Sequence, residues 1–173
     1  MGGERILAAT GLKESLRFET LDPIRVSVAV TRQESSFVNL GRAFIILVDD
    51  NPADVLLVRE ALSTHDVTSD LLIARDGDEA IRLVDEIDSR LLPCPALVVL
   101  DLNLPRKTGF DVLQRVRSSP RWDPIPVAIL SSSDAPSDRE HAERLGASRY
   151  FQKPSNLRDL MSIGGKLKEM LPA

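Results

Sequence analysis

From residue 43 onward, short apolar runs alternate with amphipathic segments, and this alternation restricts the fold more than any other feature of the chain. Three of the runs are almost continuously apolar, which is typical of strands that are buried on both faces of a parallel sheet. We therefore predict five strands, at residues 43–48, 69–74, 96–100, 126–130 and 148–152.

The segments between and after these runs have apolar residues at helical spacing. The expected helices lie near residues 52–62, 78–91, 110–116, 137–145 and 156–167. Ser137 and Glu140 form a capping-box pattern at the start of the fourth helix, and Asn156 is the expected cap of the fifth. The pair Gly164-Gly165 is expected to weaken the middle of the fifth helix.

Strands that alternate with helices form β-α-β units, which assemble into a doubly wound sheet with right-handed crossovers. We expect a flavodoxin-like α/β fold, in which a five-stranded parallel sheet of order 2-1-3-4-5 is flanked by five helices. The order comes from the general rule for this fold class, since periodicity alone does not reveal it. It places a crevice between the carboxyl ends of the first and third strands.

Residues 1–42 do not join this alternation, so we divide the chain into an N-terminal extension at 1–42 and a folded domain at 43–173. The run PIRVSVAV (residues 23–30) has strand-like content but stands alone between polar stretches. We expect the extension to be disordered, or to result from an over-extended translation start. The alternatives are a strand or short helix added to the domain, and a binding arm.

The charge of the chain argues against a nucleic-acid-binding protein. The formal net charge is −4, and residues 1–42 hold six basic and five acidic residues, which leaves 16 and 21 for the remainder. That acidic remainder has no basic stripe to neutralise phosphates.

Cys94 is the only cysteine, so the chain cannot form an internal disulfide. No apolar run approaches the roughly 20 residues of a membrane span or resembles a signal peptide. We expect a cytoplasmic protein.

Polar side chains follow four of the predicted strands. Asp49 and Asp50 follow the first strand, Asp101 the third, Ser131 the fourth and Lys153 the fifth. In the predicted sheet these strand ends share one rim, so three carboxylates converge. At about 5 Å and an effective dielectric constant near 20, each pair of like charges costs about 3 kcal/mol, so the arrangement requires a cation. Oxygen ligands without a nearby histidine or cysteine favour Mg²⁺.

A carboxylate beside Mg²⁺ can attack a phosphoryl group and become an aspartyl phosphate. Lys153 and the Ser131 hydroxyl would then stabilise the phosphoryl oxygens. Each residue also has a simpler interpretation: Asp50 as a helix cap, Asp101 as a turn residue, Ser131 as part of a polar loop, and Lys153 as a solvated surface residue. We prefer the chemical interpretation because the four features occur together.

At these residues the sequence resembles the receiver domain of two-component response regulators, over residues 43–171. Acids, hydroxyl and lysine follow in the order of that family, with 30 residues from Asp101 to Ser131 and 52 from Asp101 to Lys153. The segments that carry the resemblance are ILVDDNPAD, VVLDLNLPRKTGFDVL, AILSSS and YFQKP.

The resemblance implies which residues hold the phosphoryl group and the metal. Asp101 would accept the phosphoryl group and would share Mg²⁺ with Asp50. Asp49 would act mostly through a metal-bound water, and Asn103 would bind the metal through its backbone carbonyl.

The resemblance also implies a conformational switch. Ser131 would move toward the phosphoryl group, Lys153 would pair with it, and Tyr150 would follow as the switch aromatic. For Tyr150 the alternative is ordinary half-buried packing at the end of a strand.

The implied activity is phosphoacceptance, in which the domain assists its own phosphorylation and dephosphorylation and has no external substrate to turn over. The implied partner is a sensor histidine kinase. The segments DNPADVLLVREAL and LDLNLPRKTGFDVLQRVR are most similar to regulators paired with phytochrome-type kinases.

The sequence ends 20 residues after Lys153, so we expect a single-domain regulator. Its output would run through the face formed by the fourth helix, fifth strand and fifth helix. This face would bind a target, or the domain would pass the phosphoryl group to a histidine phosphotransfer protein. Homodimerisation through the same face is a further hypothesis.

Two other classes of protein are alternatives to a phosphorylation switch. A phosphatase of the haloacid-dehalogenase type also attacks with an aspartate beside Mg²⁺, but it needs an acid/base aspartate two positions later, where this chain has Asn103. A pseudo-receiver would be a binding module that never carries phosphate, and the complete set of acids, hydroxyl and lysine argues against it.

Overall fold

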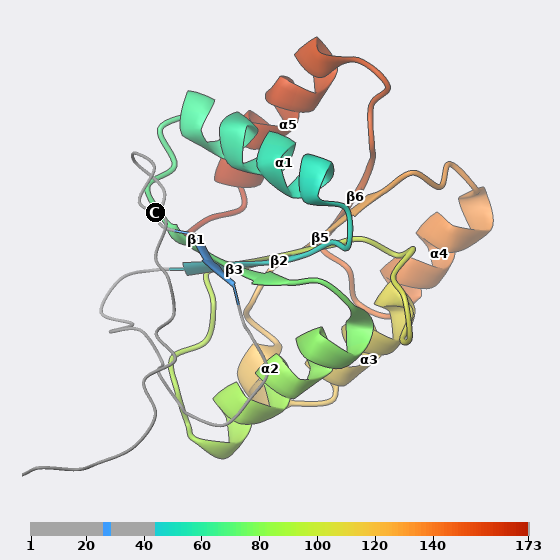
Figure 1. The fold of residues 1–173 in the computed structure, drawn as a ribbon. Helices are drawn as coiled ribbons and strands as arrows, with labels where there is room; N and C mark the ends of the chain where they lie inside the picture. The colour runs from blue at the N-terminus through green and yellow to red at the C-terminus, as the bar shows by residue number, and fades with distance from the viewer. Residues whose placement is uncertain (1–25, 29–43, 173) are drawn as a thin grey trace, which may run out of the picture.

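The structure, a computed structural model, describes residues 26–28 and 44–172. Within these residues, parallel strands form one sheet with helices on both of its faces (Figure 1). The strands are β1 (Val26–Val28), β2 (Phe44–Val48), β3 (Asp70–Ala74), β4 (Leu97–Leu100), β5 (Val127–Ser131) and β6 (Arg149–Gln152). The helices are α1 (Pro52–Thr64), α2 (Gly77–Ser89), α3 (Gly109–Arg117), the 3-10 turn η1 (Pro120–Trp122), α4 (Pro136–Arg144) and α5 (Leu157–Lys168).

The strand order of the sheet is β1-β3-β2-β4-β5-β6. Without β1 this is the flavodoxin-like order 2-1-3-4-5, so the predicted fold is confirmed. The added strand β1 pairs in parallel with β3, with Val26 opposite Leu71 and Val28 opposite Ile73. For residues 26–28, the structure agrees with the alternative in which part of the extension adds a strand to the domain. The other residues of the predicted extension lie outside the part of the chain that the structure describes.

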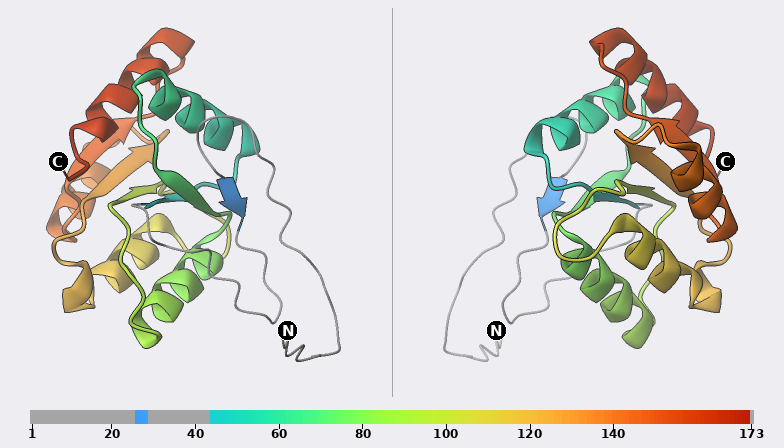
Figure 2. Two further views of the ribbon diagram at one scale, coloured as in Figure 1. Left: turned by 90° about the vertical axis from the view of Figure 1, so that its left-hand side faces the viewer. Right: turned by 90° about the vertical axis from the view of Figure 1, so that its right-hand side faces the viewer.

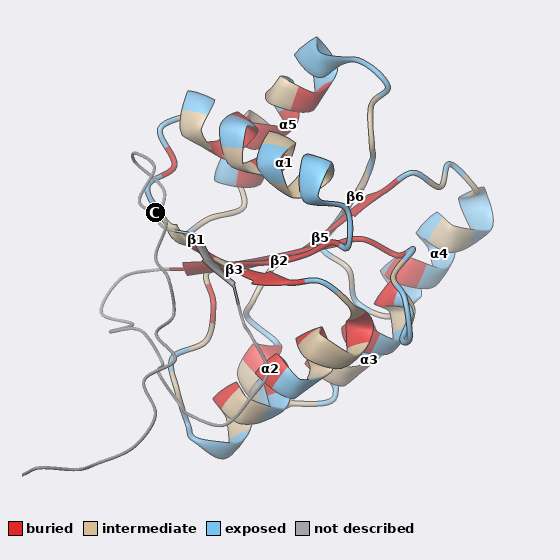
Figure 3. Cartoon of the chain, viewed as in Figure 1, coloured by how far each residue is buried: buried red, intermediate tan, exposed pale blue. Residues whose placement is uncertain are grey.

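Two apolar layers hold the helices against the sheet. Helices α1 and α5 cover one face, and α2, α3 and α4 cover the other (Figures 1 and 2). On the first face Val58 and Leu62 of α1 join Ile163 and Leu167 of α5 in one buried cluster. Every residue of β2, β4 and β5 is buried, as the red central strands of Figure 3 show. The continuous apolar runs of the sequence therefore correspond to strands covered on both sides.

The glycine pair of α5 has a structural purpose that the sequence does not reveal. A Cβ atom on Gly164 would lie 2.0 Å from the carbonyl oxygen of Ala61, so α1 and α5 approach each other at a point where only glycine fits. A Cβ atom on Gly165 would instead meet the His65 ring, at 3.1 Å. Gly164 lowers the helix propensity of α5, but its lack of a side chain allows α1 and α5 to pack closely.

Helix α4 begins differently from the sequence prediction. Its first residue is Pro136, and the N-cap residue Ala135 makes no side-chain cap. The predicted capping box of Ser137 and Glu140 is therefore wrong. Proline favours the first helical turn because its missing N–H would have no partner there. The Ser133 hydroxyl, 2.6 Å from Asp138 Oδ2, fixes the start of the helix instead. The predicted cap Asn156 is confirmed, since its side chain accepts from the Asp159 N–H.

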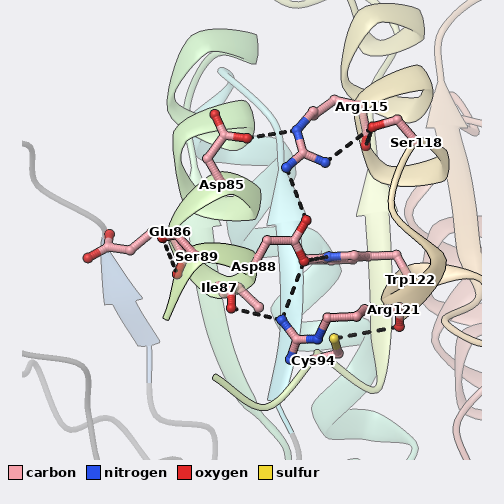
Figure 4. A network of polar contacts seen from close by, with 10 residues as sticks. All are labelled: Asp85, Glu86, Ile87, Asp88, Ser89, Cys94, Arg115, Ser118, Arg121 and Trp122. Carbon is pink, nitrogen blue, oxygen red and sulfur yellow. Dashed lines mark hydrogen bonds and ion pairs between the residues drawn. The ribbon is translucent and has the colours of Figure 1, made fainter. Parts of the chain in front are cut away.

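A polar network joins α2, α3 and η1 at the end of α2 (Figure 4). Asp88 accepts hydrogen bonds from Trp122 Nε1 at 2.8 Å and from Arg115 Nη2 at 3.0 Å, and it pairs with Arg121. The Trp122 side chain is fully buried, so its N–H needs this partner. The Cys94 thiol, in the loop before β4, donates a long hydrogen bond to the Arg121 carbonyl at 3.7 Å.

Candidate functional site

Backbone hydrogen bonds bring the predicted site residues together at the carboxyl ends of the strands. The Asp101 N–H donates to the Val48 carbonyl at 2.9 Å, and the Lys153 N–H donates to the Ser131 carbonyl at 2.7 Å. The parallel pairing therefore continues one residue beyond each strand, to the residue that carries the functional side chain. The sheet itself sets the spacing of these groups.

Three carboxylates meet at this rim, as the sequence predicts. Asp49, Asp50 and Asp101 each present an oxygen atom, and these atoms lie within 4.8 Å of one another. Asp49 and Asp101 are only 2% and 5% exposed, whereas Asp50 is exposed. The alternative of Asp50 as a helix cap is wrong, because Asn51 caps α1 by accepting from the Ala53 N–H. Asp50 is therefore available as a ligand at the open side of the cluster.

The Lys153 ammonium forms ion pairs with three carboxylates. Its ammonium lies 2.7 Å from Asp101 Oδ2, 2.8 Å from Asp49 Oδ2 and 2.8 Å from Asp54 Oδ2. The lysine side chain is 13% exposed, so it is not a solvated surface residue. Sequence reasoning missed Asp54, which lies in the first turn of α1. The signal was its position four residues after Asp50, one helical turn away.

Burial and ion pairing shift the protonation equilibria of the site. Burial raises the pKa of Asp49, and this outweighs the hydrogen bonds from Lys153 and the Asn51 N–H, which lower it. Burial alone would lower the pKa of Lys153, but its hydrogen bonds to Asp101, Asp49 and Asp54 raise it above the usual value. The ammonium is therefore charged at neutral pH. Three carboxylates contact this single cation, and Asp50 lies beside two of them, so the site has excess negative charge.

The donor set of the cluster fits a hard divalent cation. All three groups are carboxylates, and among the described residues no histidine or cysteine belongs to the cluster. Such oxygen-rich sites suit Mg²⁺, Mn²⁺ or Ca²⁺ better than zinc or copper. Burial raises the pKa of Asp49, and a bound cation would favour its charged form.

Asn103 links the two loops that contain Asp101 and Ser131. Its N–H donates to Asp101 Oδ1 at 3.1 Å, and its side-chain amide donates to Ser132 Oγ at 3.2 Å and, at 3.5 Å, to Ser131 Oγ. Ser131 is fully buried at the end of β5. The structure thus brings both predicted residues to the site, while the role of the Asn103 carbonyl as a metal ligand stays a prediction.

Tyr150 lies inside the domain and is 8% exposed. Its hydroxyl donates to the Ser133 carbonyl at 2.9 Å, and the Arg139 guanidinium lies 4.7 Å from the centroid of its ring. The side chain therefore connects β6 to the loop between β5 and α4, two residues from Ser131. The Tyr150 side chain is therefore packed in the interior and is also connected to the loop that follows Ser131.

A flavodoxin-like sheet that carries an acid cluster and a lysine at its strand ends is the architecture of a receiver domain. Comparison with known proteins agrees, because residues 45–163 match the response regulator receiver domain family. The chain therefore belongs to the response regulator receiver domain family.

The chain is similar to several members of this family over most of its length. Response regulator Rcp1 of Synechocystis sp. is 37% identical over 120 residues, which are 69% of this chain and 82% of Rcp1. The crystal structure of Mn²⁺-bound Rcp1 has a TM-score of 0.68 at 34% identity and covers 76% of this chain and 100% of that chain. The phosphorylated cyanobacterial phytochrome response regulator RcpA has a TM-score of 0.69 at 35% identity, with 77% and 100% covered.

The comparisons support the prediction of a histidine kinase as a partner, because receiver domains take their phosphoryl group from such kinases. Of the helices in the described residues, none has the length and apolar character that a bilayer span requires. The cytoplasmic location stays a prediction.

Proposed function

We propose that Asp101 accepts a phosphoryl group from a histidine kinase, and that a divalent cation bound by Asp49, Asp50 and Asp101 supports the transfer. The observation that carries the proposal is the position of the Lys153 ammonium, 2.7 Å from Asp101 Oδ2 and beside three carboxylates that lie within 4.8 Å of one another. A positive group at this position can stabilise the oxygens of a phosphoryl group that arrives at Asp101.

The proposed reaction moves one phosphoryl group between two side chains. A carboxylate oxygen of Asp101 attacks the phosphorus of a phosphohistidine, the O–P bond forms, and the P–N bond breaks with its electron pair remaining on the imidazole nitrogen. Asp101 is the suitable nucleophile because it is held by the Asn103 N–H on one oxygen and by Lys153 on the other. The cation, when bound, neutralises charge on the phosphoryl oxygens.

The cation is proposed to be Mg²⁺, with the Asn103 carbonyl as an additional ligand. Support comes from the all-oxygen donor set and from the similar protein Rcp1, whose crystal structure is of a Mn²⁺-bound form. Mg²⁺ and Mn²⁺ favour the same oxygen ligands. The proposal includes no external substrate for turnover, because Asn103 cannot transfer protons as the second aspartate of a phosphatase would.

The proposed output surface is the face formed by α4, β6 and α5. Tyr150 supports this choice, since its hydroxyl bonds to the Ser133 carbonyl, and movement of Ser131 toward a phosphoryl group would disturb that loop. Partners at this face would be a target protein, a histidine phosphotransfer protein or a second copy of the chain. The similarity to RcpA, a phytochrome response regulator, supports a phytochrome-type kinase as the donor.

The test is phosphorylation of the full chain with acetyl phosphate and Mg²⁺, followed by intact-mass spectrometry. The wild-type chain should gain one phosphoryl group that hydroxylamine removes, because acyl phosphates react with this nucleophile. Asp101→Asn should gain none, whereas the control Asp123→Asn, an exposed aspartate outside the site, should behave as wild type. An unmodified wild-type chain would favour the pseudo-receiver instead.

A further inference from the structure

One ammonium at the site is shared by three carboxylates that differ in their surroundings. The side chains of Asp49 and Asp101 are 2% and 6% exposed, whereas that of Asp54 is 25% exposed. Asp54 does not belong to the group of described carboxylates that is spaced to hold a metal. Lys153 therefore has two partners that a cation would also use, and one that it would not.

Each oxygen of the two buried carboxylates already accepts one hydrogen bond. Asp49 Oδ1 accepts from the Asn51 N–H at 2.9 Å, and Asp49 Oδ2 accepts from Lys153. Asp101 is occupied in the same manner, by the Asn103 N–H on Oδ1 and by Lys153 on Oδ2. A divalent cation that binds these carboxylates repels the ammonium that shares them, so it favours a position of the ammonium farther from the cation.

We infer that Asp54 is the carboxylate toward which Lys153 shifts when a divalent cation engages Asp49 and Asp101. The inference rests on the proposed cation site. The shift moves the ammonium from the most buried partners to the most exposed one, and it keeps the charge paired, because a buried charge that loses its only partners carries a large penalty. Asp54 is thus a positioning residue for Lys153, which it retains within reach of Asp101.

A neutral side chain at position 54 should weaken cation binding. In Asp54→Asn the amide oxygen still accepts a hydrogen bond but no longer carries the charge that pairs with the displaced ammonium. Hydrogen bonds to charged partners are stronger than neutral ones, and the difference corresponds to an affinity for Mg²⁺ that is lower by about three- to tenfold. The longer Asp54→Glu side chain keeps the charge and should restore most of the affinity.

A loss of affinity could also follow simply from removing a negative charge near the cation. The two causes separate in the Lys153→Met background, where no ammonium has to move. If Asp54 acts through Lys153, Asp54→Asn should then change the affinity less than twofold. If it acts directly on the cation, the three- to tenfold loss should persist.

The experiment is isothermal titration calorimetry of MgCl₂ into the unphosphorylated full chain, with circular dichroism as a check on folding. The variants are Asp54→Asn, Asp54→Glu, Lys153→Met and Lys153→Met/Asp54→Asn, and the control is Glu60→Gln, which removes an exposed charge from the same helix. Weaker binding in Asp54→Asn that disappears without Lys153 supports the inference.

Two results would overturn it in distinguishable ways. If the wild type binds Mg²⁺ and Asp54→Asn binds it equally well, or loses affinity to the same extent without Lys153, the inference is wrong and the proposed cation site stands. If the wild type does not bind Mg²⁺, both are wrong.

Discussion

Replacing Gly164 by alanine should destabilise the domain, although alanine is the better helix former. The new Cβ atom would lie 2.0 Å from the Ala61 carbonyl oxygen, whereas ordinary contact begins at 3.4 Å, so α1 and α5 would have to separate by about 1.4 Å. The backbone fixes the position of the Cβ atom and the other atom is a backbone oxygen, so no rotamer change can relieve the overlap.

The magnitude follows from two opposing effects. Separation disturbs the buried cluster formed by Val58 and Leu62 with Ile163 and Leu167, and overpacking of this kind costs about 3 kcal/mol. Higher helix propensity offsets about 1 kcal/mol of it. The free energy of unfolding should therefore fall by about 2 kcal/mol.

The neighbouring Gly165 provides a matched control on the same helix. A Cβ atom there meets the His65 ring at 3.1 Å, and that ring is the far end of a side chain that can move by a few tenths of an ångström. Gly165→Ala should therefore leave stability unchanged or raise it by up to about 1 kcal/mol.

Urea unfolding, followed by far-UV circular dichroism and by the fluorescence of the buried Trp122, measures both variants under one condition. Because the propensity gain is the same in both, the difference between them isolates the contact with Ala61. If Gly164→Ala is as stable as Gly165→Ala, the two helices do not approach each other as described.

Two further perturbations test the polar network and the site. Burial alone would raise the pKa of Asp88, but hydrogen bonds from Trp122 and Arg115 lower it below its usual value of 3.8. This stabilisation is present above pH 3.8 and is lost as the pH falls through the pKa of Asp88 in the folded state. Asp88→Asn should therefore reduce the free energy of unfolding by about 1–3 kcal/mol at pH 7 and by less at pH 3. An equal loss at both pH values would show that the charge of Asp88 does not stabilise the fold. At the cluster, millimolar MgCl₂ should raise the melting temperature of the wild type, because binding to the folded state alone stabilises it. Asp50→Asn should show a smaller rise, and an identical rise would exclude Asp50 as a ligand.

Much of the fold and site could be predicted because the signals are local. A continuous apolar run identifies a strand that is buried on both faces, and the residue after each run lies at the carboxyl end of that strand. Given the strand order, Asp49, Asp101 and Lys153 had to meet at one rim. The structure confirms their proximity with distances of 2.7 to 2.8 Å to the ammonium.

The features that were missed depend on how separate elements approach each other. Asp54 reaches Lys153 only because of the direction in which α1 leaves β2, and Gly164 is required only because α5 lies against Ala61. The predicted start of α4 was wrong because the capping-box pattern at Ser137 was preferred over Pro136, which favours the first turn of a helix. No periodicity within one segment contains this information.

The position of β1 matters for any shortened form of this protein. A chain that begins at residue 43, where the alternating pattern starts, would lack Val26–Val28 and would expose the backbone groups of β3 that now pair with them. An open, regular strand of mainly apolar residues recruits other strands and promotes aggregation. Expression should therefore start upstream of residue 26, so that β3 keeps its pairing with β1.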